Sequence, residues 1–179
     1  LLALLYERDI SGPQARVLRG SIGVGLGGGE AAPLPASGVV ANVHVDRFDA
    51  QAWEQSFSAT TEFSAGASAD TGSASLGYLP TRLALRTDQL DLGGRRFHRV
   101  VLGASREGGG PWLANIGAEE LDGHLAYRPP SGNQSGSLRA RLTRLSLASG
   151  SARQVEQILE QPSSVPALDI AVDELTVGN

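Results

Sequence analysis

Residues 83–102, LALRTDQLDLGGRRFHRVVL, contain two runs of alternating apolar and polar side chains on either side of Gly93-Gly94. Alternation with a period of two is typical of a β-strand that buries one face. After Asp88 the alternation shifts by one position, which predicts a bulge or bend between Asp88 and Gln89 that keeps one face apolar. The two glycines can adopt the positive φ angles of a two-residue turn, so the stretch predicts a β-hairpin.

The first half of this pattern recurs 85 positions later, at residues 168–179, LDIAVDELTVGN. The two segments align without gaps, with the same shift after the equivalent Asp88 and Asp173 and a glycine after the last apolar residue. Because the sequence stops at Asn179, where a second hairpin would turn, we expect residues 1–179 to be a single fragment of a longer repetitive β protein. The hairpin 83–102 would then be repeated from residue 168 and cut off at residue 179.

Six more segments carry strand-like alternation, at residues 1–7, 16–26, 38–48, 112–116, 121–127 and 136–147. Two short helices are expected, one over residues 49–55 with Asp49 as its N-cap and one over residues 151–159 that ends before Pro162. Residues 56–75, rich in Ser, Ala, Thr and Gly, are expected to form a loop or linker. The predicted fold class is therefore mainly β, a large curved antiparallel sheet with two short helices.

The composition argues against several classes of function. All 15 basic residues are arginine, and they are interspersed with 19 acidic residues to give a net charge of −4, which is not the footprint of a nucleic-acid-binding protein. The absence of cysteine excludes disulfides and thiolate metal sites. No apolar run approaches the ~20 residues of a membrane-spanning helix.

The histidines offer a weak case for metal chemistry. His44 and Asp46 share one strand face, as do Asp122 and His124, and the two pairs could form a metal site if their strands were neighbours. A solvated sheet face explains the same pattern more simply, and no Gly-x-Ser-x-Gly motif supports a hydrolase. We therefore expect no enzymatic activity, no cofactor and no metal. The basic cluster around His98, with Arg95, Arg96 and Arg99, could contact a lipid phosphate or simply form a polar hairpin edge.

The motifs occur in a recognisable order. An Arg-Val-Leu-Arg-Gly strand (16–20) precedes Leu34-Pro35 and a strand that leads to Trp53. The hairpin Leu-x-Leu-x-x-Asp-x-Leu-x-Leu-Gly-Gly, a Trp…Leu-x-Gly-x-Leu-x-Tyr-Arg segment (112–128), a patterned strand (136–147) and Val-Pro-Ala-Leu-Asp-Ile follow. This order resembles the periplasmic region of the YhdP-type proteins in the AsmA-like superfamily. The resemblance implies a protein anchored in the inner membrane of Gram-negative bacteria by an N-terminal helix. It also implies a long β-sheet with an apolar concave face, and a non-enzymatic role in phospholipid transport to the outer membrane and in envelope integrity.

An open apolar sheet face could shelter phospholipid acyl chains, at ~0.8 kcal/mol per buried CH₂. The residues expected to contact lipid are Leu18, Ile22, Val24, Val43, Val45, Leu83, Leu85, Leu90, Leu92, Leu125, Leu138 and Leu142. Phospholipid acyl chains and other envelope proteins are the expected partners. The same face could equally be an ordinary closed core, and a β-sandwich module that binds carbohydrate or protein is the alternative. A metal hydrolase built on His44 and His124 is a third and less favoured reading.

Overall fold

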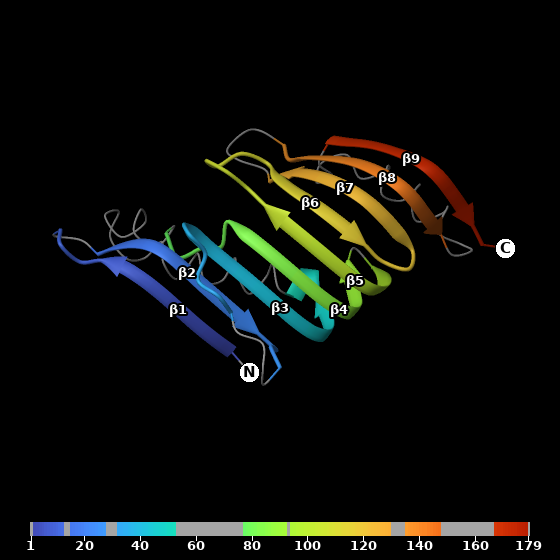
Figure 1. Cartoon of the computed structure of the whole chain (residues 1–179). Helices are drawn as coiled ribbons and strands as arrows, with labels where there is room; N and C mark the ends of the chain where they lie inside the picture. Colours follow the sequence, from blue (N-terminus) through green and yellow to red (C-terminus); the bar gives the residue numbers. More distant parts are fainter. Residues whose placement is uncertain are drawn as a thin grey trace. The chain divides into compact units, whose positions relative to one another are not determined.

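The structure is a computed structural model that describes residues 2–12, 15–27, 32–52, 77–92, 94–129, 135–147 and 167–178. Nine strands lie in these ranges and follow one another across one mixed sheet in sequence order (Figure 1). They are β1 (Leu2–Asp9), β2 (Arg16–Val24), β3 (Gly38–Asp49), β4 (Arg82–Leu92), β5 (Arg95–Ser105), β6 (Trp112–Gly117), β7 (Leu121–Arg128), β8 (Ser137–Leu147) and β9 (Ala167–Val177). Each of the strands expected from alternation is present, so the mainly β prediction is confirmed.

The prediction of an antiparallel sheet is wrong at three places. The pairs β2–β3, β3–β4 and β8–β9 are parallel, whereas β1–β2, β5–β6, β6–β7 and β7–β8 are antiparallel. Alternation reports which side chains share a face but not the direction of the neighbouring strand. Parallel neighbours need a connection of about a dozen residues or more, and residues 25–37, 50–81 and 148–166 are long enough to supply it.

The described residues contain one short helical turn, at residues 50–52, and not the two helices that were expected. The backbone N–H of Ala52 donates a hydrogen bond to Asp49 Oδ1 at 3.0 Å, so Asp49 caps the turn as predicted. Residues 53–55 of this expected helix, the expected loop 56–75 and the expected helix 151–159 lie outside the described residues. In the part of the chain that the structure describes, no helix has the length and apolar character needed to cross a membrane.

The chain divides into two compact units, Leu1–Val100 and Val101–Asn179, and each is described by itself. The core of the first unit lies on one face of β3 and β4. Val39, Ala41 and Val43 alternate along β3 and are buried, and Ala41 and Val43 lie opposite Leu83 and Leu85 of β4. The apolar alternation seen in the sequence is therefore the buried side of a parallel strand pair.

The shift of alternation after Asp88 is present in the structure and is shared by β3. Thr87 and Leu90 are both buried, although an unbroken alternation would place them on opposite faces. Their partners on β3 are Val45 and Phe48, which are separated by the same three positions, and the register between the two strands does not change across the shift. The two strands therefore shift together, so the expected irregularity is a common bend of the pair and not a bulge of one strand against the other.

A buried hydroxyl group holds this bend. Thr87 Oγ1 lies 2.9 Å from the carbonyl oxygen of Gln89 and 3.2 Å from that of Asp46, one on its own strand and one on β3. The Thr87 side chain is only 2% exposed, so these carbonyl groups give the hydroxyl the partner that a buried polar group requires. A threonine inside an apolar face is thus explained by the backbone that it bonds.

The core of the second unit centres on β6, β7 and β8, where Ile116, Leu121, Ala140 and Leu142 are buried. Leu125 lies opposite Ala140 across the β7–β8 pair, and both belong to the same apolar face. The face therefore continues through three adjacent strands of this unit.

A β-bulge interrupts the β7–β8 pair. Asp122 lies opposite Arg144 and Gly123 opposite Leu142, so Thr143 is the extra residue on β8. Thr143 Oγ1 donates to Asp122 Oδ1 at 3.0 Å. Gly123 has a φ of 154°, and a Cβ at this position would collide with the backbone of β8, so only glycine fits. The apolar alternation of β8 passes from Leu142 to Leu145, so it shifts by one position where this bulge lies.

Candidate functional site

The apolar face of the first unit brings together five of the residues predicted to contact lipid. Ile22 of β2 lies beside Ala41, which lies opposite Leu83 of β4, and the next row along the strands is Val24, Val43 and Leu85. Residues in register on adjacent strands point to the same side of the sheet. These five residues therefore form one continuous surface within this unit.

This surface changes from closed to open across the strands. Val43 and Leu85 in the middle are 4% and 5% exposed, whereas Leu2 and Leu4 of β1 are 64% and 59% exposed. Leu2 lies opposite Val24 and Leu4 opposite Ile22, so both belong to the same face. We refer to Leu2 and Leu4 as the β1 strip. The apolar face therefore extends beyond its buried residues, onto exposed residues of β1.

Two tyrosines limit the β1 strip at one end. The ring of Tyr6 covers Gly20 of β2 and meets the ring of Tyr78 edge to face, with the centroids 5.2 Å apart. Tyr6 OH donates a hydrogen bond to the carbonyl oxygen of Tyr78 at 3.1 Å. Desolvation by partial burial raises the pKa of Tyr6, with a smaller contribution from Tyr78, so its hydroxyl stays neutral at ordinary pH. The apolar surface thus ends at a polar contact made by aromatic side chains.

The apolar face of the second unit also changes from buried to exposed across its strands. Leu138 of β8 lies opposite Leu168 of β9, and the next row pairs Ala140 with Ile170. Ala140 is buried, whereas Leu168 and Ile170 are 44% and 52% exposed. Four exposed apolar residues on this face of β9 form what we call the β9 strip: Leu168, Ile170, Leu175 and Val177.

The β9 strip was missed among the predicted lipid contacts. The signal was available, because its four residues align with Leu83, Leu85, Leu90 and Leu92, which were all included in the prediction.

The twelve predicted residues differ in how much surface they can offer to a ligand. Four are buried: Val43, Leu85, Leu90 and Leu142. Leu18 and Leu92 are exposed, and the remaining six are half-buried, namely Ile22, Val24, Val45, Leu83, Leu125 and Leu138. The four buried side chains therefore have little surface to offer a ligand, whereas the other eight are at least partly accessible.

The opposite, polar face carries ion pairs that cross between strands. Arg47 of β3 and Arg96 of β5 both bind Asp91 of β4, at 2.6 Å and 2.9 Å. The guanidinium group of Arg96 and then that of Arg47 lower the pKa of Asp91. The basic cluster of the first hairpin is thus partly engaged in an ion-pair network, which favours the reading as a polar hairpin edge.

The second unit has a corresponding network on β8 and β9. Asp169 accepts bonds from Arg141 at 2.9 Å and 3.0 Å and from Arg139 at 3.0 Å. Arg141 first, and Arg139 less strongly, lower the pKa of Asp169. Both networks are exposed to solvent, so they define which face is polar more than they stabilise the fold.

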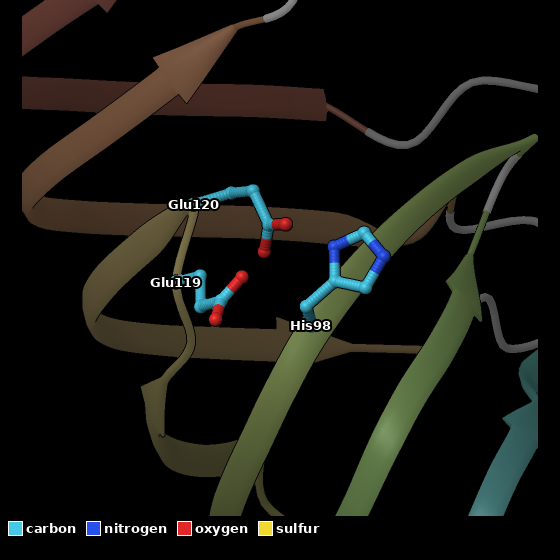
Figure 2. Close-up of side chains that lie close together, drawn as sticks. All are labelled: His98, Glu119 and Glu120. Carbon is cyan, nitrogen blue, oxygen red and sulfur yellow. The ribbon is translucent and has the colours of Figure 1, made fainter.

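The histidine pairs do not form the metal site that was considered. His44 lies on β3 and His124 on β7, which are not neighbouring strands, and His124 Nδ1 instead forms a hydrogen bond with Asn115 Oδ1. Figure 2 shows the side chains of Glu119 and Glu120, which extend from the β6–β7 connection of the second unit, together with His98 of β5. Only the two glutamates belong to the same unit, and two adjacent carboxylates alone do not define a metal centre.

The comparison with known proteins agrees with the order of motifs. A family model described as YhdP protein matches residues 2–179, which is nearly the whole chain. No curated protein and no solved structure matches the chain.

Proposed function

The chain belongs to the YhdP family, and from this premise we propose that it is a non-enzymatic segment of a periplasm-spanning protein that is anchored in the inner membrane and carries phospholipid toward the outer membrane. The family is implicated in phospholipid transport through the envelope. In this proposal the segment resides in the periplasm and contributes to envelope integrity.

The observation that carries the proposal is the exposed apolar surface at the margins of both units. The β1 strip and the β9 strip each continue a buried apolar face, so their side chains are not isolated exposed residues. Contiguous apolar surface on a protein marks a site that contacts a partner, a ligand or a membrane. Side chains alternate between the two faces of a strand, so the sequence neighbours of the strip residues lie on the opposite face. The strips therefore consist of apolar side chains and suit hydrocarbon chains, which form no hydrogen bonds.

The half-buried residues extend the proposed lipid surface inward from each strip. Contact by the exposed and half-buried members of the predicted set, with the buried members as their support, removes acyl CH₂ groups from water at ~0.8 kcal/mol each. A phospholipid with two chains needs only part of each chain covered to be held reversibly. Reversible binding of this kind favours passage of the phospholipid along the surface over tight storage.

Native mass spectrometry of the purified chain after incubation with phospholipid vesicles tests the proposal. We expect bound phospholipid on the wild-type chain and a severalfold loss in Ile170→Asp, since a carboxylate on the β9 strip would have to be desolvated by the acyl chain. Ala171→Asp is the matched control, because Ala171 is the next residue on β9, is exposed and lies on the opposite face. The absence of bound phospholipid on the wild-type chain, or equal loss in both variants, would contradict the proposal.

The alternative, a β-sandwich module that binds carbohydrate or protein, requires two sheets packed face to face. The described strands form one sheet in sequence order instead. A role in binding carbohydrate or protein would gain support if the same experiment showed no bound lipid and the chain bound a glycan or protein ligand instead.

A further inference from the structure

A cavity of about 340 Å³ lies in the second unit where β7 ends and β8 and β9 begin. Its lining includes Pro111, Ala126, Arg128, Ser137, Arg139 and Asp169, together with Ala167 and with Leu138 and Leu168 of the apolar face. Ala126 and Arg128 belong to the polar face of β7, since they alternate with Leu125 and Tyr127 of the apolar face. The cavity is therefore bordered by polar side chains of one face and also by Leu138 and by Leu168 of the β9 strip.

The register explains why a hollow forms here. One row across the strands is Arg128, Ser137 and Ala167, and the next is Ala126, Arg139 and Asp169. Each row contains an alanine and one arginine. The short side chains of the two alanines leave a space that Arg128 and Arg139 border.

The polar side chains around the cavity differ in whether they have hydrogen-bond or ion-pair partners. Arg139 binds Asp169, and Asp169 is also bound by Arg141, so one carboxylate is shared by two guanidinium groups. Arg128, in contrast, has no ion pair or hydrogen bond from its side chain to any residue in the described ranges. The Ser137 hydroxyl, directly opposite Arg128 on β8, likewise has no side-chain hydrogen bond there. Two cationic side chains and one carboxylate line the cavity, which leaves it with a positive charge.

We propose that this cavity binds a small phosphate-bearing anion, with Arg128 and Ser137 as its donors. Arg128 supplies a planar fork of N–H groups that matches two phosphate oxygens, and Ser137 supplies one hydroxyl across the strand pair. Arg139 adds positive charge behind them. The cavity is larger than an inorganic phosphate ion requires, so the anion is one with an organic substituent, such as glycerol phosphate or a phospholipid headgroup. Leu138 and Leu168 also belong to the proposed acyl-chain surface, so the two sites adjoin. The anion site rests on Arg128 and Ser137 and is tested with a soluble ligand that has no acyl chain.

Titration of the ¹⁵N-labelled 179-residue chain with glycerol 3-phosphate, followed by NMR, tests the proposal. We expect saturable shifts at Arg128, Ser137 and Arg139, and at least a tenfold loss of affinity in Arg128→Gln. Arg128→Lys should keep part of the affinity, because the charge remains and the fork is lost. Ala167→Leu should also abolish binding, since it fills the hollow without removing a charge.

The matched control is Arg86→Gln, because Arg86 is an exposed arginine on β4 that lies outside the cavity and has no side-chain partner in the described ranges. It should bind as the wild-type chain does. A second arm uses vesicles of anionic phospholipid. Binding of glycerol 3-phosphate identifies a soluble ligand, and binding of vesicles alone, lost in Arg128→Gln, identifies a headgroup. No binding in either arm, or equal losses in Arg86→Gln and Arg128→Gln, would overturn the proposal.

Discussion

Strands β4 and β9 have the same sequence pattern but different burial. Each is 11 residues long, and each pairs in parallel with the strand before it in an unchanged register across the shift of alternation. Leu85 and Leu90 of β4 are 5% and 4% exposed, whereas the equivalent Ile170 and Leu175 of β9 are 52% and 56% exposed. Equivalent residues therefore share a face but not an environment.

The difference teaches that alternation decides which side chains share a face, while neighbouring elements decide whether the face is buried. β4 has β3 on one side and β5 on the other, whereas β9 pairs only with β8 among the described strands. We propose that β3–β4 and β8–β9 are two copies of one repeating unit, because β4 and β9 have equal length and pair in parallel with the preceding strand.

The largest expected effect comes from placing a charge at equivalent positions of the two strands. Leu85→Asp should abolish cooperative folding of the first unit, at a cost of about 3 kcal/mol or more, because an unpaired carboxylate would be buried. Ile170→Asp should cost about 1 kcal/mol or less, since its side chain already meets water. Urea unfolding followed by circular dichroism measures both. Equal tolerance of the two changes would mean that β4 is not part of a packed core.

The next effect tests the β-bulge between β7 and β8, the strand that pairs with β9. Gly123→Ala should destabilise the second unit by about 2–4 kcal/mol, because the new Cβ would lie 2.7 Å from the Cα of Leu142 at a φ that only glycine adopts readily. Gly103→Ala is the matched control in the same unit, since a Cβ there meets nothing within 4 Å. Thermal unfolding followed by circular dichroism compares the two. A Gly123→Ala chain as stable as the control would refute the bulge geometry.

A smaller effect concerns the bend, where the two strands differ in the residue that carries the buried hydroxyl. Thr87 of β4 corresponds to Val172 of β9. Thr87→Val should cost about 1–2 kcal/mol, because the carbonyl oxygens of Asp46 and Gln89 lose the hydroxyl that bonds them. Val172→Thr should change the free energy of unfolding less, since Val172 is only half-buried. If urea unfolding gives the same value for Thr87→Val and wild type, the bend does not require this hydroxyl.

The smallest effect is the dependence of stability on pH. Arginine neighbours lower the pKa of Asp91 and of Asp169 in the folded chain. The stabilisation from each is therefore fully present above the unfolded-state pKa of about 3.9 and is lost as the pH falls through the lower folded-state value. Urea midpoints measured from about pH 6 to about pH 2 should fall at the acidic end. Asp91→Asn together with Asp169→Asn should flatten that fall, and an unchanged profile would argue against both ion-pair networks.

Local pattern predicted much of this fold and less of the candidate site. The nine strands, the cap at Asp49 and the shift after Asp88 follow from side chains a few positions apart. The residues of the apolar faces were recognised for the same reason. The β9 strip and the cavity beside Arg128 were not, because each depends on which strand lies next to which.

The amino-acid sequence by itself determined that the chain forms strands, which side chains share a face, and where the alternation shifts, since the period of two is a property of each strand alone. Only the tertiary structure decided that three strand pairs are parallel and that Leu85 is buried while Ile170 is exposed. It also decided that Arg128 is paired with Ser137 on the adjacent strand, beside a cavity. Strand direction and burial are set by residues far apart in the chain, whose pairing no local pattern encodes.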